Sequence, residues 1–323
     1  MSPKIIDSHV HIFPDPLAHW YEEGRTKVQP YLPLPHWSEL RQLGRALMTG
    51  YTESLQSVQP MMRYLPESVR STLDVVGTMG SLPGFLVESN VDDLKQRMQK
   101  NGVSQAVVVA HPPFAPNELV LKAAHQDPSL IPCVYIPTET NKPAQALKRL
   151  VEEEGARALK IHTAADGEAP SAPRYRALLK AAGDLGIPVI IHTGCVHTGF
   201  IYKKPELASV ELFVPWFKNY PQQKFLLSHM NFHSPDQAIE LCEKYPSLYV
   251  DTSWQPAEVI GEAVRRIGPE RVLFASDWPI MGRNMDVAIR RINDAVSSGF
   301  IQQSDADLIL GENAIQFFKL AAI

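Results

Sequence analysis

Short apolar runs alternate with longer segments of helical periodicity along most of this 323-residue chain. Eight runs rich in valine and isoleucine have the length and composition of buried strands. They are residues 5–12, 105–110, 131–136, 156–161, 187–191, 224–227, 248–250 and 272–275. From the second run onward they recur about every 25–35 residues, which is the length of one strand–helix unit.

The segments between these runs carry apolar residues three and four positions apart, as Leu94 and Met98 do, which predicts amphipathic helices. The helices expected with defined ranges are 91–100, 143–154, 172–185, 235–245, 256–267 and a closing helix at 304–321, with Ser304 as its N-cap. Apolar strands that alternate with such helices indicate a parallel sheet covered on its outer side. Eight units without a dinucleotide-binding glycine motif favour an α/β fold of the (β/α)8 TIM-barrel type over an open doubly wound sheet.

One stretch interrupts the rhythm, because about 90 residues separate the first run from the second. Residues 14–66 are rich in proline and aromatic side chains. We therefore expect a single barrel domain over residues 1–323, with an insertion at about 14–90. The insertion either packs as a surface element or covers the barrel mouth as a lid, since the loops at that face build active sites.

Composition excludes several classes of function. The net charge of −4 leaves no basic excess for nucleic acid or an anionic membrane. No segment approaches the roughly 18 consecutive apolar residues of a membrane helix, and the N-terminus has no apolar signal core. Three widely spaced cysteines fit a reducing compartment. We expect a cytoplasmic protein with a small-molecule substrate, in which the aromatic insertion is a candidate homo-oligomer interface.

Two histidines stand at the end of the first predicted strand. Residues i and i+2 of a strand project from the same face, so His9 and His11 point together. On the inward face of a barrel, two imidazoles about 6–7 Å apart can bind one ion. The alternative is a pair of core histidines whose hydrogen bonds are satisfied by the protein.

Further metal-binding side chains follow three other strands. His192 ends the fifth, His229 the sixth and Asp277 the eighth. Because the carboxyl ends of parallel barrel strands open on one face, these residues and the first pair are expected to meet at one mouth. Imidazole and carboxylate together suit Zn²⁺, Mn²⁺ or Fe²⁺. We expect a divalent metal, zinc foremost, as one ion with a second as the alternative.

The sequence resembles the amidohydrolase superfamily, and more narrowly the amidohydrolase-related branch that includes aminocarboxymuconate semialdehyde decarboxylase. The motifs behind this resemblance are Ile-Asp-Ser-His-Val-His at 6–11, Ile-His-Thr-Gly at 191–194, Ser-His at 228–229, Phe-Ala-Ser-Asp-Trp-Pro at 274–279 and Leu-Gly-Glu-Asn-Ala at 310–314. The resemblance implies a metal-bearing barrel. It implies that His9, His11, His192 and Asp277 ligate the metal, with His229 as an acid/base or a ligand of a second ion.

The fourth predicted strand adds Lys160 and His162, which share a face by alternation. In hydrolase branches of the superfamily, a lysine at this strand end can be carboxylated and bridge two metals, and Lys160 matches that position. In the decarboxylase relatives one metal suffices. Alternatively, the Lys160 ammonium binds a substrate carboxylate or pairs with Asp277. His162 is a weaker candidate for a second metal or for the substrate pocket.

Two enzymatic hypotheses follow. In the first, a hydrolase activates a metal-bound water against an ester, lactone or amide of a small carboxylated molecule, with Asp277 taking the proton and His229 donating a hydrogen bond. The alternative is a non-oxidative decarboxylase or hydratase of a small aromatic or unsaturated carboxylic acid, in which Asp277 and His229 move protons at carbon. A third class, a metal-binding barrel without enzymatic activity, predicts that replacing His229 changes no reaction.

Other residues have secondary roles in this interpretation. Asp7 is expected to be structural and out of the metal's reach. Residues placed to face the mouth or to hydrogen-bond a ligand are His111, Cys195, His197, Asp251, Thr252 and Trp254. Arg45, Arg63 and Arg283 are candidates to bind a substrate carboxylate. The histidines expected in loops or at the surface are His19, His36, His125 and His233.

Overall fold

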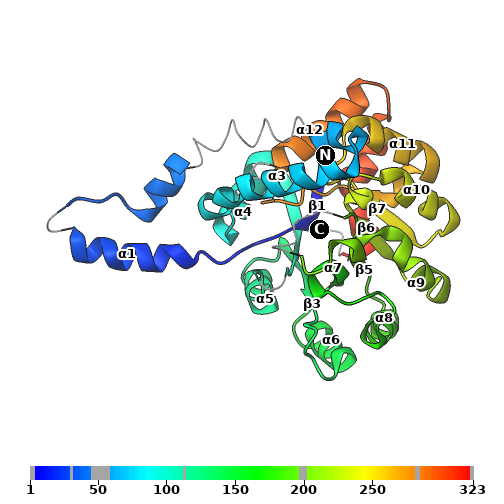
Figure 1. Ribbon diagram of the computed structural model, residues 1–323, viewed down its shortest axis with the longest axis horizontal. Coiled ribbons are helices and arrows are strands. Elements are labelled where there is room, and N and C mark those ends of the chain that lie inside the picture. The colour runs from blue at the N-terminus through cyan, green and yellow to red at the C-terminus, as the bar shows by residue number, and fades with distance from the viewer. Residues whose placement is uncertain are drawn as a thin grey trace.

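A computed structural model describes residues 4–29, 32–44, 59–111, 114–195, 202–280 and 284–320. Eight parallel strands follow one another in chain order around a single sheet (Figure 1). They are β1 (Ile5–Val10), β2 (Val103–Val109), β3 (Leu130–Tyr135), β4 (Ala158–Ile161), β5 (Val189–His192), β6 (Phe225–Ser228), β7 (Leu248–Asp251) and β8 (Val272–Leu273). All eight predicted strands are present, which confirms the α/β barrel; β1, β4, β5 and β8 are shorter than expected.

The chain that follows β8 runs beside β1 and brings the two ends of the sheet together. The amide of Ser8 donates to the carbonyl of Phe274 at 2.9 Å, and the amide of Asp277 donates to the carbonyl of His9 at 2.8 Å. The amide of His11 likewise donates to the carbonyl of Trp278 at 2.7 Å. These backbone bonds hold the first and last predicted site motifs against each other.

Helices surround the strands on the outside (Figure 1). The outer layer consists of α4 (Val91–Asn101), α5 (Asn117–Gln126), α6 (Pro143–Glu152), α8 (Pro173–Leu185), α9 (Val214–Asn219), α10 (Pro235–Lys244), α11 (Ala257–Ile267) and α12 (Asn284–Ser297). Short connecting elements are α7 (Thr163–Asp166), η2 (Pro205–Ala208), η3 (Val210–Phe213), η4 (His229–Asn231) and η5 (Pro269–Arg271). Among the described helices, none combines the length and apolar character that a membrane-spanning segment requires.

The pairing register of β1 is irregular between Asp7 and Val10, and this decides which side chains face the interior. Ile6 belongs to the apolar cluster inside the barrel, together with Val107 and Leu226. Val10, in contrast, packs with Leu94 of α4 in the cluster outside the sheet. Because His9 and His11 flank Val10 in the sequence, their side chains turn to the opposite side, toward the interior of the barrel.

The end of the chain forms three short helices instead of the single closing helix expected from the sequence. These are α13 (Gln303–Asp307), the π-helical η6 (Leu308–Glu312) and α14 (Asn313–Phe318). The expected N-cap at Ser304 was wrong, because Gln302 and Asp305 form a capping box that satisfies two backbone donors. Gly311 lies so close to β1 that a Cβ atom there would sit 1.9 Å from the carbonyl oxygen of Lys4.

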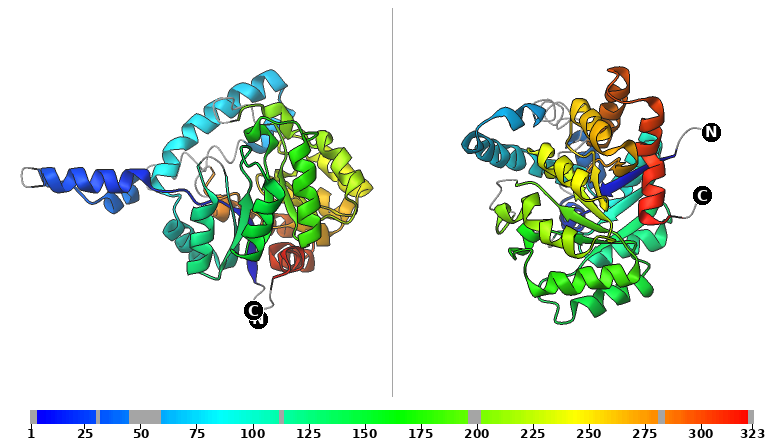
Figure 2. Two further views of the ribbon diagram at one scale, coloured as in Figure 1. Left: turned by 90° about the horizontal axis from the view of Figure 1, so that it is seen from below. Right: turned by 90° about the vertical axis from the view of Figure 1, so that its right-hand side faces the viewer.

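The insertion after β1 contains α1 (Pro16–Val28), η1 (Gln59–Tyr64) and α3 (Glu67–Val87). The helix α1 extends away from the barrel, whereas α3 lies at the end opposite the C-terminal helices (Figure 2). Arg63 donates to Glu258 at 3.2 Å, and Asp74 lies 3.1 Å from Nε2 of His233, in the loop after β6. These contacts tie η1 and α3 to the side where the strands end. Complete capping of the mouth, the single domain and the homo-oligomer stay predictions.

Candidate metal centre

Six histidines form a closed circle of neighbouring rings at the carboxyl ends of the strands. In order around the circle they are His9, His11, His111, His162, His192 and His229. Successive ring centroids are 5.0, 5.4, 5.4, 3.9 and 5.0 Å apart, and the last ring lies 5.2 Å from the first. The barrel thus brings together imidazoles from β1, β2, β4, β5 and β6 that lie far apart in the sequence.

Asp277 joins this circle from the chain that follows β8. Its Oδ1 lies 3.3 Å from Nε2 of His11 and 3.7 Å from Nε2 of His9. Its Oδ2 accepts a hydrogen bond of 2.8 Å from the indole of Trp254. Burial opposes ionisation of the Asp277 carboxyl, but His229 and His11 outweigh it and hold the pKa below its ordinary value. The carboxylate is therefore ionised at neutral pH.

Hydrogen bonds on the outer side of the first histidine pair fix which ring nitrogens face inward. Nδ1 of His11 lies 2.8 Å from the carbonyl oxygen of Val109, which can only accept, so Nδ1 carries the proton. Nδ1 of His9 lies 3.3 Å from the carboxylate of Asp251 and carries the proton for the same reason. In the neutral form of each ring, Nε2 then carries the lone pair that a metal ligand requires, and the lone pair of His9 faces Nζ of Lys160 at 3.4 Å.

Among the residues that the structure describes, one group of potential ligands is close enough together to bind one ion. It consists of His9, His229 and Asp277, whose nearest ligand atoms are all within 4.8 Å of one another. Two of the predicted ligands, His11 and His192, are not part of this group. The ring of His192 stacks on that of His162, and its Nε2 is buried without a hydrogen-bond partner. Imidazole and carboxylate ligands together with an orphaned buried nitrogen fit a divalent transition metal.

Burial keeps the imidazoles neutral, which is the form that binds metal. It lowers the pKa of His9 and His192 well below the ordinary value, with Lys160 and neighbouring imidazoles adding to the effect. It also lowers the pKa of His229, and that of His111 to about 3. At neutral pH these rings therefore offer lone pairs and single N–H donors, not positive charges.

Lys160 is the buried cation of the site. Its Nζ lies 3.4 Å from Nε2 of His9, and its side chain is almost fully buried. Burial lowers the pKa of the Lys160 ammonium to about 8, against the opposing effect of Asp277. The sequence analysis left open a direct ion pair between Lys160 and Asp277. It is not formed, because Nζ of Lys160 lies more than 4.0 Å from the carboxylate oxygens of Asp277.

His162 is held in the opposite tautomer from the first pair. As the N-cap of α7, its Nδ1 accepts a hydrogen bond of 3.2 Å from the amide of Ala165. The proton of the neutral ring therefore resides on Nε2, which is buried without a partner. This arrangement favours a hydrogen-bond donor over a ligand of a second metal.

The backbone at three strand ends adopts left-handed conformations that side chains other than glycine rarely take. The φ angles are 62° at His229, 67° at Trp254 and 58° at Asp277. Such conformations require energy of order 1–3 kcal/mol each and cluster at functional sites, where surrounding contacts hold them. Their coincidence with the candidate residues supports a functional role for this end of the barrel.

Asp7 and Thr252 bond to the backbone of the chain that follows β8. Oδ1 of Asp7 accepts from the amides of Ser276 at 3.0 Å and His9 at 3.2 Å, so it links β1 to the chain after β8. Burial raises the pKa of Asp7 to about 7. The hydroxyl of Thr252 accepts from the amide of Ala275 at 3.1 Å and holds β7 to the same segment.

The remaining candidates are divided. Cys195 is half-buried after β5, and Arg63 is engaged by Glu258. His36 and His125 are exposed, as expected. His233 lies in a loop but is not solvated, since its side chain is only 7% exposed and contacts Asp74. The candidates outside the described part of the structure are Arg45, His197, Arg283 and the side chain of His19.

Two residues near the site were missed by the sequence analysis. Ser253 contacts His229, and its signal was available, because it follows Asp251 by two positions at a strand end. The ring of Tyr202 lies 4.8 Å from that of His162. Tyr202 comes from a long connection after β5, and no local pattern marks it.

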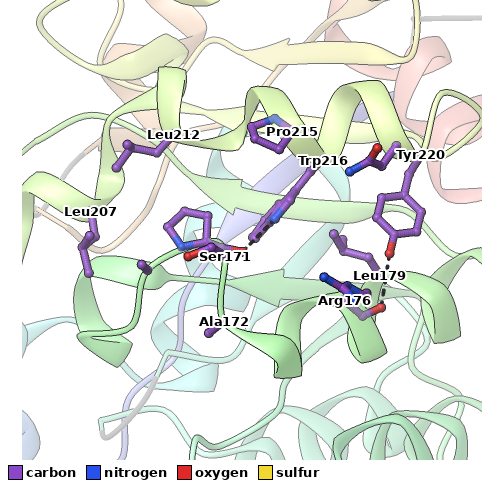
Figure 3. Close-up of a pocket in the computed structure, with 12 residues that line it drawn as sticks. Ser171, Ala172, Arg176, Leu179, Leu207, Leu212, Pro215, Trp216 and Tyr220 are labelled. Carbon is purple, nitrogen blue, oxygen red and sulfur yellow. Dashed lines mark hydrogen bonds between the residues drawn. The ribbon is translucent and has the colours of Figure 1, made fainter.

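A separate pocket of about 360 Å³ opens between α8 and α9 on the outer helical layer (Figure 3). It is lined mainly by apolar residues, among them Leu179, Trp216 and Tyr220, with Arg176 at its edge. None of the six histidines lines it, nor does Asp277. The pocket is therefore not part of the candidate metal centre.

Comparisons with known proteins agree with this architecture. A family profile described as Amidohydrolase matches residues 86–320. No curated protein matches the chain.

Three solved structures illustrate the shared fold. An uncharacterized TIM-barrel protein from Bordetella bronchiseptica is 18% identical, with a TM-score of 0.65, over 99% of this chain and 100% of its own. A 4-oxalomesaconate hydratase from Rhodopseudomonas palustris is 17% identical, with a TM-score of 0.62, over 98% and 96%. A 5-carboxyvanillate decarboxylase from Sphingomonas paucimobilis is 14% identical, with a TM-score of 0.62, over 99% and 100%.

Proposed function

We propose that this chain, which belongs to the amidohydrolase family, is a metal-dependent enzyme that acts on a small carboxylated molecule. The observation that carries the proposal is the position of Asp277, whose Oδ1 lies 3.3 Å from Nε2 of His11 and 3.7 Å from Nε2 of His9. A carboxylate oxygen and two imidazole nitrogens that face one another in a buried space are a typical set of metal ligands.

In this proposal His9, His11, His192 and Asp277 hold one divalent ion, with zinc foremost and manganese or iron as alternatives. The orphaned Nε2 of His192 supports its inclusion. When bound, an ion of this kind supplies Lewis-acid chemistry, since it lowers the pKa of water and polarises a carbonyl group. The protein's own residues supply the orientation and the proton transfers.

Lys160 is proposed to bind the carboxylate of the substrate. Its ammonium is buried beside His9, and no carboxylate of the protein pairs with it within 4.0 Å among the described residues. An ammonium in a site of low dielectric attracts an anion more strongly than one in water. Because the group has a pKa of about 8, most of it is charged at neutral pH.

Hydrolysis of an ester, lactone or amide is the first candidate reaction. Asp277 would accept a proton from the attacking water and pass it to the leaving group. His229 belongs to the same group as His9 and Asp277, so once protonated on Nε2 it would donate a hydrogen bond to the carbonyl oxygen. The description of the family as Amidohydrolase supports this class of reaction.

Decarboxylation or hydration of a small carboxylic acid is the second candidate. It is favoured by the single group of potential ligands among the described residues, which suits one ion. The names of the similar hydratase and decarboxylase also support it. Here Asp277 and His229 would take and return protons at carbon.

A paired assay tests the proposal and separates the two reactions. Protein loaded with Zn²⁺, Mn²⁺ or Fe²⁺ is offered aromatic esters, lactones and anilides that carry a carboxylate, and ¹³C-carboxyl-labelled aromatic acids. We expect metal-dependent turnover in one set, lost in Asp277→Asn. Acid and alcohol or amine products indicate hydrolysis, and labelled CO₂ indicates decarboxylation. Turnover that persists after removal of the metal would contradict the proposal.

A further inference from the structure

We propose that Asp251 and Ser253 form a positioning unit that fixes the tautomers of His9 and His229, so that Nε2 of both rings faces the centre of the site. The catalytic importance of the unit rests on the proposed metal-dependent function, whereas its effect on the two rings does not. Neither residue is placed to touch the reacting atoms. They act through the histidines.

Asp251 ends β7 and is completely buried. Its Oδ1 accepts from the amide of His229 at 2.9 Å, from the amide of Ser253 at 3.1 Å and from the hydroxyl of Ser253. Its Oδ2 lies 3.3 Å from Nδ1 of His9. One carboxylate therefore binds a donor from β1 and donors from the segments that follow β6 and β7.

The hydroxyl of Ser253 determines the state of His229. A serine hydroxyl has one proton, and this one is donated to Asp251. Nδ1 of His229 lies 2.7 Å from the same oxygen, so the oxygen must accept there and Nδ1 must carry the proton. Ser253 thus links Asp251 to the ring of His229. Asp251 itself contacts His229 through the backbone amide of His229 and not through the ring.

Asp251 therefore orients two of the three residues that could share an ion, His9 directly and His229 through Ser253. His9 and His229 both belong to the group that includes Asp277. Because Nδ1 of each ring faces Asp251 or Ser253, Nε2 is the nitrogen that remains for an ion. A ligand histidine held by a carboxylate on its other nitrogen has a fixed ring orientation and a more basic ligand atom. With the wrong tautomer, a ring in the same position presents an N–H and cannot act as ligand or base.

A purely structural role for Asp251 is the competing explanation, since loss of any buried hydrogen-bond network destabilises a protein. The two explanations differ in what they predict for the ring protons. We would label histidine with ¹⁵N and read each tautomer from long-range ¹H–¹⁵N couplings in metal-free protein. His9→Asn and His229→Asn would assign the two signals.

In the unmodified chain both rings should carry the proton on Nδ1. Ser253→Ala should change the tautomer population of His229 alone, and Ser253→Thr, which keeps the hydroxyl, should restore it. Asp251→Asn places an amide N–H opposite Nδ1 of His9 and should shift that ring to the Nε2–H form. Thr252→Val removes a neighbouring buried hydroxyl whose hydrogen bonds within the described structure are to Ala275, just after β8, so it should leave both tautomers unchanged.

Zinc affinity, measured by competition with a chelator, provides the second readout. Asp251→Asn should weaken binding of Zn²⁺ about 10–100-fold, as is usual for loss of a group that orients a ligand. Unchanged tautomers in both Ser253→Ala and Asp251→Asn would overturn the inference. The tautomers could shift as expected while neither the unmodified protein nor any variant binds Zn²⁺. In that case the positioning unit is supported and the proposed function is contradicted.

Discussion

Nζ of Lys160 lies 3.4 Å from Nε2 of His9, inside a barrel where both side chains are buried. This brings a positive charge within contact distance of an atom that is proposed to ligate a cation. The ammonium therefore opposes metal binding and favours an anion beside the metal. The two effects make Lys160 the residue whose replacement separates affinity for metal from affinity for substrate.

Lys160→Met should strengthen binding of Zn²⁺ and weaken binding of the carboxylated substrate. Removal of the ammonium relieves its repulsion of the ion, while the substrate carboxylate loses its partner. We expect KM to rise about tenfold, which corresponds to about 1.4 kcal/mol, with a smaller change in kcat. Metal titration and steady-state kinetics measure both. A variant that loses metal instead would indicate that Lys160 is a carboxylated metal ligand.

His162→Asn should leave the metal content of the protein unchanged. The amide of Ala165 donates to Nδ1 of His162, so Nε2 carries the proton and is not free to ligate. Asparagine is a preferred N-cap and should preserve the start of α7. Elemental analysis of both proteins is the measurement. Loss of an ion from the variant would show that His162 is a ligand after all.

Gly311→Ala should destabilise the barrel strongly. A Cβ at this position would lie 1.9 Å from the carbonyl oxygen of Lys4, which is backbone and cannot move aside without displacing β1. We expect a loss of about 3 kcal/mol or more in the free energy of unfolding, at the upper end of overpacking effects. Urea denaturation provides the value.

Gly24→Ala is the matched control, because Gly24 is an exposed helical residue and a methyl group added there would meet no atom within 4 Å. Alanine is the better helix former by about 0.5–1 kcal/mol, so this variant should be equally stable or more stable. Equal stability of the Gly311 and Gly24 variants would contradict the close approach of η6 to β1.

The pair of Asp127 and Lys95 predicts a pH-dependent contribution to stability. Lys95, at 2.8 Å, and Ser129 lower the pKa of Asp127 to about 2. A carboxyl whose pKa is lower in the folded state stabilises the fold above the ordinary value near 3.8 and loses that effect as the pH falls toward 2. Because the pair lies at the surface, where solvent screens the charges, we expect this contribution to be small.

Asp127→Asn keeps the hydrogen bonds from Ser129 but removes the charge. Its deficit in melting temperature should be largest near pH 6 and should narrow as the pH is lowered from 4 toward 3. Lys95→Met should show the same trend. A deficit that is constant over this range would exclude the charged pair as its cause.

The strands could be predicted because a buried parallel strand appears in the sequence as a continuous apolar run, as in β5 (Val189–His192). The interruption of the C-terminal helix could not be predicted, because it depends on a tertiary contact. In the π-helical turn η6, Gly311 lies against the backbone of Lys4, which precedes β1. That contact joins opposite ends of the chain. The orientation of α1, which extends away from the barrel, likewise has no local signal (Figure 1).

The meeting of His9, His229 and Asp277 could be predicted because parallel strands end at one mouth. The protonation of the rings could not, since it depends on partners distant in sequence. Val109 bonds to His11 from the next strand, and Asp251 bonds to His9 from β7, 242 positions later in the sequence. A sequence pattern shows which side chains gather, and only the fold shows which of their atoms face one another.

The number of transition-metal ions bound per chain tests the central claim most directly. Protein purified without chelators and analysed by mass spectrometry of its elements should contain about one zinc, manganese or iron ion per chain. His9→Asn and Asp277→Asn should reduce that content at least tenfold, while the exposed His36→Asn should leave it unchanged. Unmodified protein that contains no such ion and binds none on titration with Zn²⁺, Mn²⁺ or Fe²⁺ would contradict the account.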